Sequence, residues 1–75
     1  KQDVLQKAAD SYQKALELVA PNDPLRYNYA LALGGVDTQL DRPQDAITAY
    51  QQALQASPQS PDNWRIEETI ARLYA

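Results

Sequence analysis

The chain has 75 residues, a net charge of −3 and neither cysteine nor histidine. It therefore has no disulfide, no thiol nucleophile, none of the usual zinc ligands and no side chain that titrates near neutrality without help. Its acidity removes the electrostatic reason for binding phosphate backbones. These absences predict neither an enzyme nor a nucleic-acid binder, and no metal or cofactor.

Two features concern what surrounds the sequence. No apolar run approaches the ~20 residues of a membrane span, and no signal-peptide pattern stands at the start, so we expect no membrane insertion. The chain lacks an initial methionine and stops in the middle of a helical pattern at "ARLYA". We therefore expect it to be a piece of a longer protein, whose compartment the sequence leaves open.

The first two predicted helices lie near residues 2–20 and 24–40. The first has one apolar stripe with helical spacing, formed by Val4, Leu5, Ala8, Tyr12, Ala15, Leu16 and Val19. Asp23 and Pro24 begin the second, because they pair an N-cap residue with proline at the first helical position. Between Leu25 and Leu40 the apolar residues cover a wider arc, so we expect this helix to pack on more than one side.

The last two predicted helices lie near residues 43–56 and 61–75. Pro43 places the start of the third at Asp41 or Arg42, and the pair Ser60-Pro61 places the start of the fourth. The apolar face of the fourth comprises Trp64, Ile66, Ile70, Leu73 and Tyr74. No segment alternates as a half-buried strand does. The sequence thus predicts one all-α domain over residues 1–75.

A phrase is repeated within the chain. "AADSYQKALELVAP" at positions 8 to 21 resembles "AITAYQQALQASP" at positions 46 to 58, with an alanine, a tyrosine, an alanine and a leucine matching at an offset of 38. Alternating small and large side chains lets neighbouring helices approach closely and fill the gaps between them. The repeat predicts antiparallel helical hairpins that stack on one another. An ordinary four-helix bundle is the alternative.

Residues 27 to 60 resemble a tetratricopeptide repeat, a helix–turn–helix of 34 residues with the pattern W-x2-L-G-x2-Y…A-x3-F…P. The matching residues are Leu33, Gly34, Ala46, Tyr50, Ala53 and Pro58. Ala30 and Asp37 depart from the pattern, since they stand where Trp and Tyr are expected. The resemblance implies a short α-solenoid in which residues 1–20 are the second helix of a repeat, 24–58 a complete repeat and 61–75 the first helix of a following one.

The last helix fits the pattern in two registers. Trp64 matches the Trp of the pattern, which leaves Glu67 and Glu68 on its L-G pair. Alternatively, the run from Ile70 to Tyr74 matches L-G-x2-Y, with extra residues in the preceding turn. We prefer the second register because it keeps two carboxylates out of the packed seam.

The resemblance implies an interaction module, such as an assembly factor for a larger complex, that binds a peptide or a partner domain in a concave groove. The implied groove positions are Asn28, Leu31, Gly35, Thr38, Gln39, Arg65 and Arg72. Asn28 and the two arginines could hold carboxylates of a partner through charge-assisted hydrogen bonds. The family's clamp for chaperone tails needs Lys and Asn where Leu31 and Gly35 stand, so we do not predict that partner.

Other residues have structural interpretations. Gly34 is expected at a close approach between helices, while Gly35 costs helix stability and leaves room for a ligand. Asp41 and Asp45 are expected as cap and dipole partners of the third helix. The tyrosines are expected in the core. A second function class also fits, a spacer or self-association element that uses the Val4–Val19 stripe or the Ile66–Leu73 face.

Overall fold

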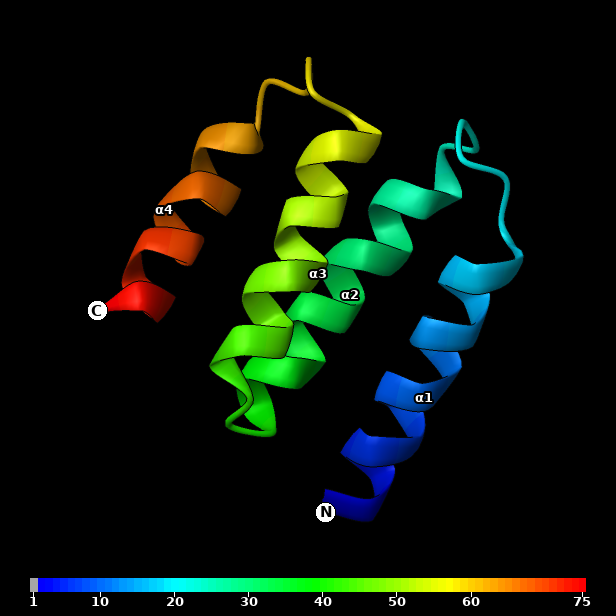
Figure 1. Ribbon diagram of the computed structural model, residues 1–75, viewed down its shortest axis with the longest axis vertical. Helices are drawn as coiled ribbons and strands as arrows, with labels where there is room; N and C mark the ends of the chain where they lie inside the picture. The colour runs from blue at the N-terminus through cyan, green and yellow to red at the C-terminus, as the bar shows by residue number, and fades with distance from the viewer. Residues whose placement is uncertain (1) are drawn as a thin grey trace.

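The computed structural model describes residues 2–75 (Figure 1), which form four helices: α1 (Gln2–Leu18), α2 (Leu25–Gln39), α3 (Pro43–Ala56) and α4 (Asn63–Tyr74). The all-α prediction is confirmed, since no strand occurs in this range. The third helix has the predicted bounds, α1 and α2 are slightly shorter than expected, and α4 begins two residues late. Within the described range no helix combines the length and hydropathy that crossing a membrane requires.

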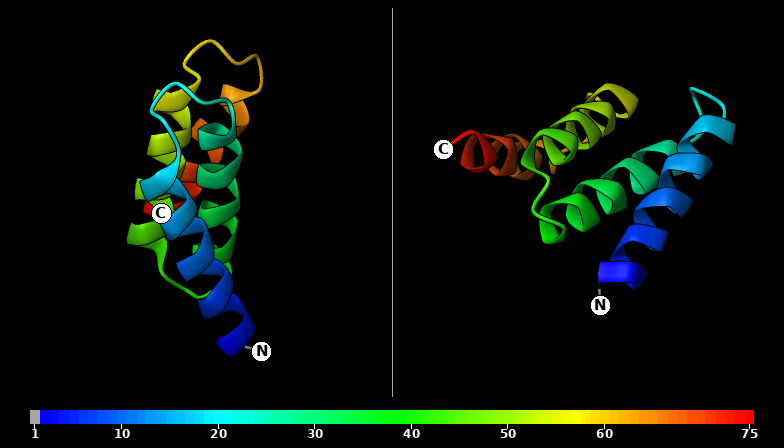
Figure 2. Two further views of the ribbon diagram at one scale, coloured as in Figure 1. Left: turned by 90° about the vertical axis from the view of Figure 1, so that its right-hand side faces the viewer. Right: turned by 60° about the horizontal axis from the view of Figure 1, so that its bottom comes forward.

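The helices form an open array. Consecutive helices run antiparallel, and among residues 2–75 the helix backbones approach closely only between neighbours in the chain, α1 with α2, α2 with α3 and α3 with α4. Figures 1 and 2 show α1 and α4 at opposite edges. The array measures 34 × 32 × 15 Å, much thinner than it is wide. The predicted stacking of hairpins therefore holds, and no contact between α1 and α4 closes the array.

The second helix is packed on two sides, as its wide apolar arc predicts. Ala30, Leu33, Gly34 and Asp37 are all buried on it. A Cβ atom added at Gly34 would lie 2.6 Å from the ring of Tyr50 on α3, closer than real Cβ contacts allow. The predicted close approach at Gly34 is confirmed.

The two outer interfaces of the array have equivalent residues. In the first, the rings of Tyr12 on α1 and Tyr29 on α2 have centroids 6.4 Å apart, and the Arg26 guanidinium donates to the Leu16 carbonyl over 3.1 Å. The core residues Ala9, Tyr12 and Leu16 of α1 have counterparts 38 positions on in α3, and Tyr29, Leu33 and Val36 of α2 have counterparts 37 positions on in α4. The counterparts, all buried or half-buried, are Ile47, Tyr50, Leu54, Ile66, Ile70 and Leu73. The α1–α2 pair and the α3–α4 pair are therefore two versions of one packing arrangement.

The fourth helix corrects one prediction about its apolar face. Ile66 is buried and Ile70 and Leu73 are half-buried, but Trp64 is 57% exposed and Tyr74 is 65% exposed. Because, within residues 2–75, the backbone of α4 comes close only to that of α3, one stripe of α4 is covered and the other is not. The predicted single apolar face is thus two faces, and the Ile66–Leu73 face is not free for self-association.

The turns before α2 and α4 differ in how well they follow prediction. Asp23 Oδ1 accepts a hydrogen bond of 2.9 Å from the Leu25 N–H, so the predicted cap forms. The start predicted at Ser60 and Pro61 is two residues early, because α4 begins at Asn63, although Ser60 Oγ accepts a weak hydrogen bond of 3.4 Å from the Asp62 N–H as a capping serine does. The reason is that Asn63 Nδ2 donates to the Ser57 carbonyl over 2.7 Å, which holds residues 57–62 in a turn.

Asp41 ends α2 and does not cap α3, which corrects its predicted role. Its φ is 60°, in the left-handed region. Its N–H donates to the Thr38 carbonyl over 3.1 Å, and the Arg42 N–H donates to the Asp37 carbonyl over 2.9 Å. These two bonds are the pair that closes a helix C-terminus around a left-handed residue, a position that favours glycine. Asp45, by contrast, lies in the first turn of α3 as expected.

Asp41→Gly should raise the free energy of unfolding by about 0.5–1 kcal/mol, because glycine adopts the left-handed conformation without a Cβ penalty. Urea unfolding followed by circular dichroism measures the change. Asp41→Ala is the matched control, since it removes the same carboxylate but keeps Cβ, and it should bring no gain. Equal effects of the two substitutions would show that charge and not backbone conformation matters here.

Candidate functional site

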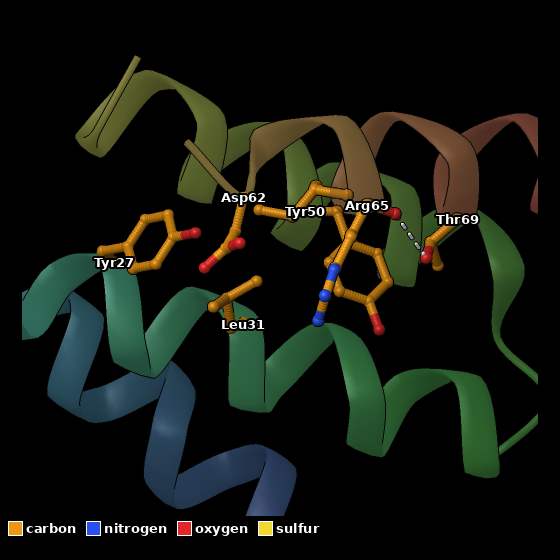
Figure 3. Close-up of a pocket in the computed structure, with 7 residues that line it drawn as sticks. Tyr27, Leu31, Tyr50, Asp62, Arg65 and Thr69 are labelled. Atoms are coloured by element: carbon orange, nitrogen blue, oxygen red, sulfur yellow. Dashed lines mark hydrogen bonds between the residues drawn. The ribbon is translucent and has the colours of Figure 1, made fainter. Parts of the chain in front are cut away.

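A groove of about 320 Å³ lies between α2 and α4. Helix α2 contributes Tyr27 and Leu31 to it, and α3 contributes Tyr50. The remaining lining residues come from α4 and its first turn: Asp62, Arg65, Ile66 and Thr69 (Figure 3). The groove thus has an apolar base with polar groups along its α4 side.

The turn before α4 sets the width of this groove. The hydroxyl of Tyr27 on α2 lies 3.4 Å from Ser60 Oγ and 3.5 Å from Asn63 Oδ1. Asn63 is buried, and its amide also bonds the Ser57 carbonyl. Residues far apart in sequence therefore hold the start of α4 at a defined place beside α2, although at these distances the tyrosine contacts are weak hydrogen bonds.

Glycine shapes the base of the groove. Gly34 lets the ring of Tyr50 lie directly against the α2 backbone. A Cβ atom at Gly35 would find only Tyr50 Oη, at 4.0 Å, which is an ordinary contact. Gly35 therefore leaves open space beside the tyrosine hydroxyl, in agreement with the room for a ligand that its sequence position suggests.

The α4 side of the groove carries one carboxylate and one guanidinium. Figure 3 shows the Asp62 carboxylate extending between Tyr27 and Leu31, and Arg65 lines the same groove together with Tyr50. Both residues are exposed, and within residues 2–75 they form no ion pair with each other. The Arg65 guanidinium carbon lies 5.3 Å from the centroid of the Trp64 ring. Both charges are thus available to a partner.

The structure brings only part of the predicted site together. Leu31 and Arg65 line the groove, and Gly35 adjoins it through Tyr50. Asn28, Thr38 and Gln39 are exposed on α2 outside the lining, and the Thr38 hydroxyl donates to the Gly34 carbonyl over 2.8 Å. Arg72 also lies outside the lining, with a guanidinium nitrogen 3.3 Å from a Glu68 oxygen.

Sequence reasoning missed five lining residues. Tyr27 and Tyr50 were assigned to the core, which they do reach while also facing the groove. Asp62 and Thr69 were missed although they lie three residues before and four after Arg65, the spacing of one helix face. The predicted helix near residues 61–75 contains both Asp62 and Arg65, so this spacing was visible in the sequence, whereas Ile66 is predicted only as part of the apolar face.

A smaller cavity, of about 130 Å³, lies where α1, α2 and α3 meet and contains a buried carboxylate. Asp37 is 5% exposed. Its pKa is raised from the ordinary 3.8, first because burial disfavours the charge and second because Asp45 repels it, while Arg42 acts in the opposite direction. Gln52 Oε1, from the same lining, is buried without a hydrogen-bond partner among residues 2–75. The cavity thus holds a buried carboxylate whose charge is disfavoured by burial and by Asp45, whereas the charged groups of the groove are exposed.

Two further findings bear on the chemistry of the chain. Among residues 2–75 no three His, Cys, Asp or Glu side chains gather as a metal would require. No family model matches the chain, and neither curated proteins nor solved structures give a match.

Proposed function

We propose that the chain is a module of the tetratricopeptide type that binds a segment of a partner protein in the groove between α2 and α4. The observation that carries the proposal is an apolar groove, lined by two first-helix equivalents, with unpaired charges of both signs on its α4 side. The open array, the close approach at Gly34 and the near-equivalent helix pairs all support membership of a stacking repeat family.

The two charges describe the partner segment. An apolar side chain fits against Leu31 and Ile66, since burying it there removes apolar surface from water. Arg65 would bind a carboxylate of the segment through charge-assisted hydrogen bonds. Asp62, at the other end of the groove, disfavours a second carboxylate and favours a basic side chain. We therefore propose a segment of mixed charge around an apolar residue, and not a purely acidic tail.

Binding can be followed through the one tryptophan of the chain, because the ring of Trp64 lies 5.3 Å from the guanidinium carbon of Arg65, which lines the groove. A displayed library of peptides, with acidic, basic or mixed charges around a leucine, is first selected for binding to the chain. The selected peptide is then titrated into the chain while tryptophan emission is recorded. Mixed-charge peptides should dominate the selection. Arg65→Ala should weaken the selected peptide about fivefold, or about 1 kcal/mol.

Arg72→Ala is the matched control, because it removes the same charge from the same helix seven residues further on. Its guanidinium is paired with Glu68 outside the lining, so its removal should change affinity less than about twofold. Equal losses for both arginines would favour a wider acidic-partner surface that includes Arg72. Unchanged affinity in the Arg65 variant would remove the groove proposal.

A further inference from the structure

The outer face of α1 carries an uncovered apolar stripe. Its members recur at alternating spacings of four and three residues: Val4, Ala8, Ser11, Ala15 and Leu18. Val4 is 71% exposed and Leu18 is 78% exposed, while the neighbouring stripe of α1 faces α2. We call this set the α1 outer stripe.

The outer face of α4 carries a second uncovered stripe. Its members lie three or four residues apart: Trp64, Glu67, Ala71 and Tyr74. All four are exposed, whereas the stripe that contains Ile66 is packed on α3. We call this set the α4 outer stripe.

The centre of the molecule shows what covers such stripes. The α1 outer stripe has a buried counterpart 38 positions on in α3, where Ala46, Ala49 and Ala53 are at most 2% exposed. The α4 outer stripe has a counterpart 37 positions earlier in α2, formed by Tyr27, Ala30, Gly34 and Asp37. These two counterparts lie on α2 and α3, the helices that pack together at the centre of the array. The α4 outer stripe has larger side chains than its α2 counterpart, with Glu67 in place of Ala30 and Ala71 in place of Gly34, so a helix covering it would lie farther away than α3 lies from α2.

The charges beside the two stripes are complementary. Lys7 and Lys14 border the α1 outer stripe on one side, and both are exposed. Glu67 lies within the α4 outer stripe and is exposed, and Glu68 lies beside it with a carboxylate oxygen 3.3 Å from a guanidinium nitrogen of Arg72. Opposite charges across an interface steer association and fix its register, whereas two α1 stripes or two α4 stripes would bring like charges together.

We infer that a second copy of this chain docks its α1 outer stripe on the α4 outer stripe of the first. The contact uses positions that correspond to those of the α2–α3 packing, at a wider spacing because Ala71 has the Cβ that Gly34 lacks, and it continues the array in the same direction. It is heterologous, since different faces meet, so it leaves one free stripe at each end and can extend further. This inference does not depend on a ligand in the groove.

Sedimentation velocity over a range of concentrations tests the inference with two blocked variants. Ser11→Glu places a bulky negative charge in the α1 outer stripe, and Ala71→Arg places a bulky positive charge in the α4 outer stripe. Both positions are exposed, so circular dichroism should show unchanged helix content. The unmodified chain should form a concentration-dependent series of oligomers, and each variant alone should associate at least about tenfold more weakly.

Mixing the two variants distinguishes the possible contacts. The unmodified α4 stripe of the Ser11→Glu chain can still accept the unmodified α1 stripe of the Ala71→Arg chain, so the mixture should associate more tightly than either variant alone. Gln55→Glu, at an exposed position of α3, is the control and should associate as the unmodified chain does. Dimers in either variant alone would show a symmetric contact and overturn the inference. A chain that stays monomeric at every concentration would overturn it too.

Discussion

Gly34→Val should lower the free energy of unfolding by about 2–3 kcal/mol. The new Cβ would lie 2.6 Å from the Tyr50 ring, so either the ring must move out or α2 and α3 must separate. Overpacking of this kind costs on the order of 1–3 kcal/mol. Urea unfolding followed by circular dichroism in the far ultraviolet, where helices absorb, measures the loss.

Gly35→Val is the matched control, because it makes the same change in helix propensity one residue away. The added Cβ meets only Tyr50 Oη, at 4.0 Å, so stability should change by less than about 0.5 kcal/mol. A double-mutant cycle with Tyr50→Ala separates the steric contribution, since the penalty at Gly34 should largely vanish when the ring is absent. Similar penalties at the two glycines would contradict the assigned contact.

Asp37→Asn should raise the free energy of unfolding at neutral pH by about 1–2 kcal/mol. Asp37 is 5% exposed, burial disfavours the charge of its carboxylate, and Asp45 repels that charge. Replacing the carboxylate by a neutral amide removes both penalties, and each pKa unit of such a shift corresponds to about 1.4 kcal/mol. Asp37 also lies in the last turns of α2, where the helix dipole disfavours a negative charge.

The pH dependence of this gain follows from the direction of the pKa shift. Burial and Asp45 raise the pKa of Asp37 in the folded chain above its ordinary 3.8. The folded chain therefore binds the Asp37 proton more tightly than the unfolded chain does. The protonated carboxyl stabilises the fold below pH 3.8, and this stabilisation is lost as the pH rises through the raised pKa of the folded chain. The advantage of the asparagine variant should accordingly be small in acid and complete at neutral pH.

Thermal unfolding of the unmodified chain and of the Asp37→Asn variant, from acid to neutral pH, measures the difference in their stability. Asp10→Asn removes an exposed carboxylate from α1 and serves as the control, with a change below about 0.5 kcal/mol at every pH. A gain from Asp37→Asn that does not vary with pH would indicate that side-chain shape and not charge determines it.

Much of the fold was predictable because helices depend on local signals. Apolar spacing identified all four helices, and Pro43 located the start of α3 correctly. The close approach at Gly34 was also predictable, because a glycine within a strong helix pattern often marks the place where a neighbouring helix comes near. The start of α4 was not, since it depends on the Asn63 amide reaching back to the Ser57 carbonyl, a contact that residue preferences at Ser60 and Pro61 do not reveal.

The groove depended on tertiary structure. Sequence periodicity places Arg65 and Arg72 on one helix face, but only the position of α4 beside α2 puts Arg65 into the lining and leaves Arg72 with Glu68. The same holds for Asp37, whose burial against α3 and repulsion by Asp45 follow from the way the helices meet. Local sequence determines that a stretch is helical and which residues share a face, because backbone hydrogen bonds and side-chain period are local. Which face is covered, and by what, is decided by neighbours distant in the chain.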